Sequence, residues 1–114
     1  MMKKFVLLMF MIAFVLVAAV GFSGGAWYEG GNLHRKTVRS WKNASYSNKL
    51  ATAADWALTS PKVKRIVKNS SSINTLKPFA KELVSCVDEA SSGTGYEKQD
   101  VSGVAASCMV LMGW

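Results

Sequence analysis

The chain has 114 residues, half of them apolar, and a formal net charge of +7, so it holds one domain at most. Of the 57 apolar residues, 19 lie within the first 22 positions, and the other 38 are spread over the remaining 92. The chain therefore combines an apolar leader with a body of ordinary composition. This excludes a multidomain enzyme, a polytopic membrane protein and a disordered chain.

The leader has the pattern of an export signal. Lys3 and Lys4 precede an apolar run over residues 5–22. Two interpretations compete. In the first, the leader is a signal peptide, and the small residues at positions 23–26 provide a cleavage site before Trp27.

In the second interpretation, residues 1–26 are a membrane anchor. A helix over residues 5–22 would be about 27 Å long, close to the roughly 30 Å of a bilayer's hydrocarbon core. Trp27 and Tyr28 would follow it at the membrane interface, where aromatic residues are enriched. We favour the anchor.

The charges around the leader predict its orientation. No Lys or Arg follows Lys4 until Arg35. The positive-inside rule therefore places the N-terminus in the cytoplasm and the body outside. We expect a bacterial inner-membrane protein with a periplasmic body, or a periplasmic protein if the leader is cleaved.

The body is predicted to be all-α, a small bundle of three to five short helices behind the N-terminal apolar helix. Residues 27–32 contain two consecutive glycines and are expected to form a tether to a helical domain over residues 33–114. From Leu33 onward, apolar residues recur every three or four positions, which predicts a helix that begins there.

Serine residues indicate where the next two helices begin. Ser45 or Ser47 can cap a helix that runs to about Ala57, and Ser60 can cap the one after it, because serine accepts a hydrogen bond from a first-turn amide. Pro61 suits the first helical position, where its missing amide hydrogen is not needed.

The last two predicted helices differ in composition. One begins between Thr75 and Pro78, ends near Ala90 and has a clear apolar stripe. The other covers residues 101–112 behind a capping Asp100 and carries no charge, so we predict that it is the central, buried helix of the bundle. No segment alternates with a period of two, and no strand is predicted.

The two cysteines are expected to form a disulfide. Cys86 and Cys108 lie on the apolar stripes of these two helices, and export takes them to a compartment where disulfides persist. Such a bond would stabilise the fold by about 3 kcal/mol in the chain-entropy model. The alternative is two buried thiols. A redox pair and a metal pair are disfavoured because the chain has no C-x-x-C spacing and only one histidine.

Positive charge is concentrated in one part of the body. Residues 27–81 carry a net charge of +9, whereas residues 82–114 carry −4. A basic surface attracts anionic partners such as headgroups, cell-wall polymers or acidic proteins, although solvated faces of amphipathic helices would show the same pattern. The candidate binding residues are eight cations and one aromatic residue, with Tyr46 as a second exposed aromatic: Arg35, Lys36, Arg39, Trp41, Lys42, Lys62, Lys64, Arg65 and Lys68.

No catalytic constellation, metal site or cofactor motif is apparent. Nucleic acid is not expected as a partner, because the body is exported and has no recognised binding motif. His34 is the only histidine, and an enzyme that uses His34 with Asp55 is the remaining catalytic alternative. Otherwise, Asp55 is expected to pair with Lys62 or Arg65 or to make a buried polar contact.

Three short motifs resemble those of small exported bacterial proteins to which no activity is attached. They are G-G-N-L-H at residues 30–34, W-K-N-A at residues 41–44 and N-K-L-A-T-A-A-D-W at residues 48–56. In size, helical content and a single disulfide, the body is also similar to the HdeA-like periplasmic acid chaperones. No motif of that family aligns, so this likeness concerns architecture alone.

These features predict a non-catalytic, exported helical protein. It would bind a protein or an anionic envelope component at the periplasmic face of the inner membrane, held there through residues 5–22 if they are not removed. The alternatives are an accessory subunit of a membrane complex, or a periplasmic chaperone or inhibitor released after signal cleavage.

Overall fold

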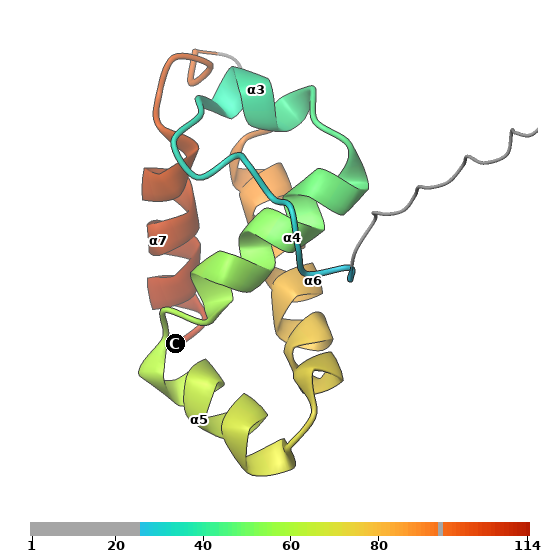
Figure 1. Cartoon of the computed structure of the whole chain (residues 1–114). Helices are drawn as coiled ribbons and strands as arrows, with labels where there is room; N and C mark the ends of the chain where they lie inside the picture. Colours follow the sequence, from blue (N-terminus) through green and yellow to red (C-terminus); the bar gives the residue numbers. More distant parts are fainter. Residues whose placement is uncertain (1–25, 94) are drawn as a thin grey trace, which may run out of the picture.

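The computed structural model describes residues 26–93 and 95–114, and the apolar leader lies outside them (Figure 1). This described part forms no strand, only an isolated antiparallel bridge, so the all-α fold class is confirmed. None of its helices is both long and apolar enough to cross a membrane. The elements are α3 (Val38–Lys42), α4 (Tyr46–Ala57), α5 (Pro61–Ser70), the short 3-10 helix η1 (Ile73–Thr75), α6 (Leu76–Ala90) and α7 (Val101–Leu111).

The central helix of the fold is α4. It crosses α6 diagonally and also contacts α7, while α3 and α5 lie at opposite ends of the molecule (Figure 1). Six of the twelve residues of α4 are buried, and four of the six are alanines. Small side chains allow neighbouring helices to approach the α4 backbone closely. The buried residues are Leu50, Ala51, Thr52, Ala53, Ala54 and Ala57.

The prediction that the last helix is the central one is wrong. Only Val101, Ala105 and Cys108 of α7 are buried, whereas Val110 and Leu111 are 77% and 81% exposed. In Figure 1, α7 lies at one side of the molecule, next to α6. Its inner face packs against α6 and, to a smaller extent, α4, whereas Ala106, Val110 and Leu111 on its outer face are exposed.

The first body helix begins later than predicted, at Val38 rather than at Leu33. The backbone before it is used for tertiary hydrogen bonds instead of helical ones. The Val38 amide donates to the Gln99 carbonyl at 2.8 Å, and the Val101 amide donates to the Lys36 carbonyl at 3.0 Å. These bonds join the start of α3 to the loop before α7, so the segment cannot wind into a helix there.

The segment predicted as a tether, residues 27–32, is attached to the body at both ends: Trp27 contacts η1 and α6, and Gly31 and Asn32 contact α4. Asn32 and Asn48 exchange two hydrogen bonds of 2.8 and 3.0 Å. Gly31 lies so close to α4 that a Cβ at this position would clash with the backbone nitrogen of Thr52. The glycine is needed here for close backbone approach and not for flexibility.

The predicted disulfide is present between Cys86 and Cys108, with Cα atoms 6.0 Å apart. It links α6 to α7, which run antiparallel. At the far end of the same pair, the rings of Phe79 and Trp114 meet edge to face with centroids 5.5 Å apart. The last residue of the chain therefore packs against the first turns of α6.

The predicted serine caps are confirmed. The hydroxyl of Ser45 accepts from the Asn48 amide, and that of Ser60 accepts from the Val63 amide, both at 3.2 Å. Asp100 holds the N-cap position of α7, as predicted, but its side chain makes no capping hydrogen bond.

Candidate functional site

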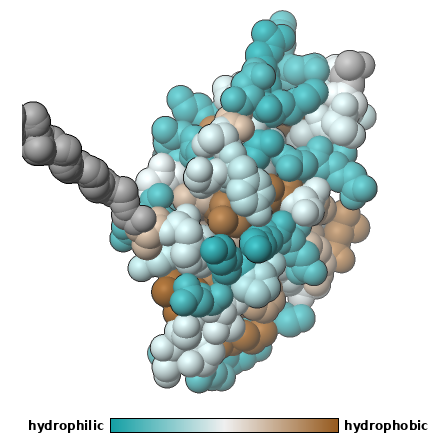
Figure 2. All heavy atoms as spheres, turned by 90° about the vertical axis from the view of Figure 1, so that its right-hand side faces the viewer, coloured by the Kyte–Doolittle hydropathy of each residue, from teal (hydrophilic) through white to brown (hydrophobic). Residues whose placement is uncertain are grey.

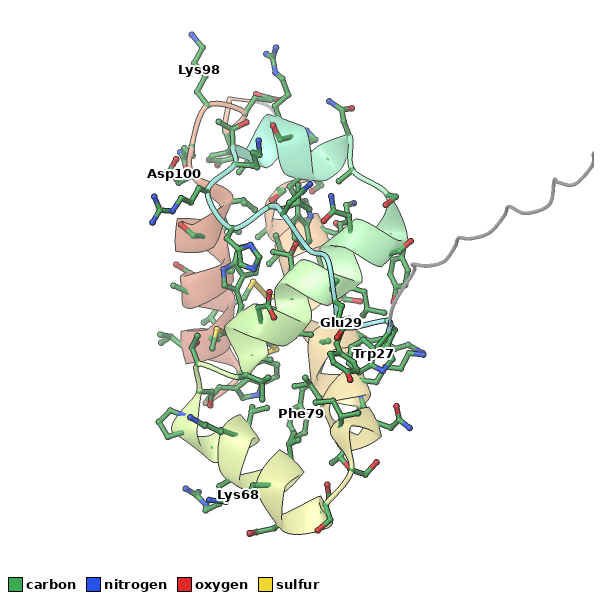
Figure 3. The ribbon with its side chains drawn as sticks, in the orientation of Figure 1. Trp27, Glu29, Lys68, Phe79, Lys98 and Asp100 are labelled. Carbon is green, nitrogen blue, oxygen red and sulfur yellow. A yellow bond between two sulfur atoms is a disulfide. The ribbon has the colours of Figure 1, made fainter. Side chains whose placement is uncertain are left out.

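The predicted basic surface is divided between two ends of the molecule. One set lies on α3 and just before it, and the other lies on α5, at the opposite end (Figure 1). In Figure 3, Lys98 lies close to the α3 end and Lys68 marks the α5 end. The two sets cannot act as one face. They are Arg35, Lys36, Arg39 and Lys42, and Lys62, Lys64, Arg65 and Lys68.

Trp41 is not a surface anchor, which corrects the prediction. Its side chain has no exposed surface, and its ring stacks on that of Trp56 with centroids 5.8 Å apart. Its indole nitrogen donates to the Asp88 carboxylate at 2.8 Å, and Lys49 donates to the same oxygen at 2.9 Å. Trp41 is thus part of the core. Tyr46, by contrast, is 54% exposed, as predicted.

The α3 end carries charges of both signs. Lys42 lies 3.5 Å from the Glu97 carboxylate and 3.4 Å from the Gly93 carbonyl. The backbone amides of Glu97 itself and of Gly95, together with Lys42, lower the pKa of the Glu97 carboxyl below its ordinary value. Asp100 lies nearby (Figure 3), so the cations at this end are partly neutralised.

The α5 end is mostly positive, with Glu29 and Glu82 at its border, and we call it the basic pole. It comprises four cations of α5 and two of the first turns of α6, and the chain has no acidic residue between positions 56 and 81. None of the six makes an ion pair with any described residue. All are exposed except Lys77, which is half-buried. The residues of the basic pole are Lys62, Lys64, Arg65, Lys68, Lys77 and Lys81.

The geometry of α5 explains why its cations face outward. Val63 and Val67 are buried four residues apart on one side of the helix, against the rest of the bundle. The remaining positions therefore point to solvent, and Ile66 among them is 37% exposed. Ile73 lies in η1, which contacts α5, and its side chain is also 37% exposed. Both isoleucines therefore belong to the α5 end of the molecule.

Trp27, close to the start of the described residues, lies beside α6 and contacts one edge of the basic pole (Figure 3). The indole nitrogen of Trp27 donates to the Asn74 side chain at 3.3 Å, and the Lys77 amine lies 5.6 Å from the centre of the Trp27 ring. Next to them, a shallow hollow is lined by Asn74, Lys77, Pro78 and Lys81. The point at which the leader joins the body, just before Trp27, is therefore in contact with the pole.

The structure brings His34 and Asp55 together, which corrects the expected pairing of Asp55 with Lys62 or Arg65. The Nε2 atom of His34 lies 2.8 Å from an Asp55 carboxylate oxygen, and both side chains are partly exposed to solvent. The His34 ring also meets the edge of Trp56 at 6.0 Å. The contact joins the segment before α3 to α4. Among the described residues, no cluster of three metal-ligating side chains surrounds it.

A second exposed feature is the outer face of α7. It consists of small and apolar side chains without a charge, and a shallow hollow on it is lined by Ala106, Ser107, Val110 and Leu111. On the side of the molecule shown in Figure 2, hydrophobic atoms reach the surface only in separate patches among hydrophilic ones.

Sequence reasoning missed Lys77 and Lys81 as members of the candidate site. They lie on a different helix from the α5 cations, and only the turn through η1 brings them to the same end of the molecule. The available signal was the long interval without an acidic residue, which spans both helices.

Comparisons with models of protein families, with curated proteins and with solved structures found no match to this chain.

Proposed function

We propose that this protein is a non-catalytic, exported helical module that binds an anionic partner through its basic pole, at the periplasmic face of the inner membrane. The observation that carries the proposal is the segregation of charge: six cations without an ion pair to a described residue occupy one end, whereas the cations at the other end are interspersed with acids. Such an uncompensated field raises the local concentration of anions and speeds their association.

The export pattern supports the proposed location. The disulfide is the kind of bond that persists outside the cytoplasm, and two lysines precede the apolar run of residues 5–22. The proposal of a binding rather than a catalytic role rests on the composition of the exposed groups. The one histidine–carboxylate pair is held in a structural contact between the segment before α3 and α4.

An accessory subunit of a membrane complex is the second candidate, and the outer face of α7 favours it. Val110 and Leu111 are almost fully exposed on a helix without charge, and exposed apolar surface of this kind is typical of contacts between proteins. The third candidate, a chaperone or inhibitor released after signal cleavage, would use the same exposed features in soluble form.

The test is a comparison of two charge-reversal variants in the host cell. One changes Lys62, Lys64, Arg65 and Lys68 to glutamate; the matched control changes Arg35, Lys36, Arg39 and Lys98. After chemical cross-linking in intact cells, the pole variant should lose most of its cross-linked envelope components, and the control should retain them. If both variants keep the same components, the basic pole is not the binding surface.

Blue-native electrophoresis after mild detergent extraction separates the first two candidates. A binding module should migrate near its own mass once salt is added, because screening weakens a contact that depends on charge. An accessory subunit should migrate with a larger complex at every salt concentration. Substitution of Val110 and Leu111 by serine should then release it.

A further inference from the structure

We infer that the anionic partner of the basic pole is the phospholipid headgroup layer of the membrane at which the chain is exported, and that the body rests on this layer with α5 and η1 facing it. This inference rests on the proposed function and names the partner of the same site. Two features of the molecule support it: the position at which the leader joins the body, and the chemistry of the pole.

The leader brings the pole close to the membrane. If residues 5–22 span the bilayer, only the four residues 23–26 separate them from Trp27. The five peptide units from Phe22 to Trp27 reach about 18 Å at most, even when fully extended. Trp27 contacts Asn74 and Lys77, so this corner of the body cannot lie farther than that from the apolar edge of the membrane.

The pole has the composition of a surface that binds lipid headgroups. The same end includes Ile66 and Ile73, each 37% exposed, whose side chains can enter the boundary between headgroups and acyl chains. Lys77 and Lys81 lie one helical turn apart beside the shallow hollow that also includes Asn74. Two amines and a side-chain amide at the rim of a hollow suit a phosphate, because each can donate a hydrogen bond to it.

The other end of the molecule is unsuited to this contact. Its cations alternate with Glu97 and Asp100, and Lys42 already lies beside Glu97. A negatively charged leaflet would therefore attract the α5 end and not the α3 end. The lysines of the pole do not bear on the orientation of the leader, because the positive-inside rule counts charges within about 20 residues of the membrane span, and Lys62 comes 40 residues after Phe22.

Lysine acetylation read by mass spectrometry can test the orientation residue by residue. The full chain is reconstituted into vesicles of phosphatidylcholine alone, or of equal parts phosphatidylcholine and phosphatidylglycerol, and treated briefly with an acetylating reagent. We expect a several-fold decrease in acetylation of Lys62, Lys64, Lys68 and Lys81 only in the anionic vesicles. The decrease should disappear in 1 M salt, where the Debye length falls to about 3 Å. Lys36 and Lys98 at the other end serve as internal controls.

A pair of variants provides the matched control. Reversal of the four α5 cations to glutamate should remove the protection of Lys81, which remains as the reporter. The variant with Lys36→Glu and Lys98→Glu should keep it. Equal acetylation in the two kinds of vesicle, or protection of Lys36 and Lys98 instead, would overturn the lipid assignment.

Membranes isolated from the host distinguish failure of this inference from failure of the proposed function. Protection of the pole lysines in those membranes, together with none in phosphatidylglycerol vesicles, would mean that the pole binds another anionic envelope component. In that case only the lipid assignment is wrong. Absence of protection in both preparations would overturn the lipid assignment and the proposed binding role together.

Discussion

Two helices of similar length, α4 and α7, show opposite relations between composition and burial. α7 has no charged residue, yet only three of its eleven residues are buried. α4 contains Lys49 and Asp55 and is rich in alanine, yet six of its twelve residues are buried. The difference teaches that apolarity determines what can be buried, whereas side-chain size and the position of neighbouring helices determine what is buried. α4 is central because alanine lets other helices approach it.

The largest expected effect concerns the bond that holds α7 in place. Replacement of both Cys86 and Cys108 by alanine should destabilise the protein by about 3 kcal/mol in the chain-entropy model, because the bond closes a loop with a sequence separation of 22. α7 has few buried side chains and no side-chain cap to compensate for the loss. Thermal unfolding of the two proteins measures the difference.

Hydrogen exchange tests whether that loss is local. In the variant without the disulfide, the amides of α7 should exchange much faster than in the wild type. The amides of α4 should remain the more strongly protected of the two helices. Uniform acceleration in every helix would mean that α7 is an integral part of the core and would contradict the distinction drawn between α4 and α7.

The next effect compares the same substitution on the two helices. Ala53→Leu in α4 should cost about 1–3 kcal/mol, because Ala53 has no exposed surface and extra atoms overpack a closed contact. Ala106→Leu on the outer face of α7 should change stability by less than about 0.5 kcal/mol, because that position is exposed. Urea unfolding of both variants provides the comparison, and similar losses would show that the outer face of α7 is covered.

A smaller effect distinguishes the starts of two helices. Ser60→Ala should destabilise the protein by about 1 kcal/mol, because it removes a hydrogen bond to the Val63 amide in a buried position. Asp100→Ala is the matched control and should cost less, since Asp100 makes no such bond. Chemical denaturation of the two single variants measures the loss of unfolding free energy in each. A greater loss for Asp100→Ala than for Ser60→Ala would contradict the difference in capping.

The smallest expected effect is a dependence of the protein's stability on pH, through Glu97 at the α3 end. The pKa of Glu97 is lowered in the folded protein, so its contribution to stability is complete above the ordinary pKa of a glutamate and is lost as the pH falls through the lowered value. The wild type should therefore lose slightly more stability in acid than Glu97→Gln does. Melting temperatures measured from pH 7 down to strongly acidic conditions test this. Parallel profiles would show that the contacts of Glu97 with the backbone and Lys42 contribute nothing.

Several local features could be predicted because their causes lie within a few residues. Ser45 and Ser60 cap their helices through the amides three positions later, and Pro61 needs no partner for its nitrogen. The apolar stripe of α6 correctly predicted a buried face, and the stripe positions of the cysteines predicted their pairing. Each of these depends on spacing along one helix or on the alignment of two neighbouring ones.

The candidate site was predicted less completely because it is assembled from distant segments. The eight cations were identified, but as one surface; the fold places them at two ends and adds Lys77 and Lys81 to the α5 group. Trp41 was assigned to the surface because it lies among cations in the sequence. Its partners, Trp56 and Asp88, come from later helices and bury it completely.

The amino-acid sequence by itself determined the all-α class, the starts of the capped helices and the disulfide, because the interactions responsible act over one or two helical turns or between adjacent helices. It also determined the uncompensated charge of the basic pole, through the absence of acidic residues over positions 56–81. Only the tertiary structure decided that α4 is central and α7 peripheral, and that Trp27 lies against the pole. These outcomes depend on which surfaces meet, and the hydrophobic effect that drives such contacts has no preferred direction along the chain.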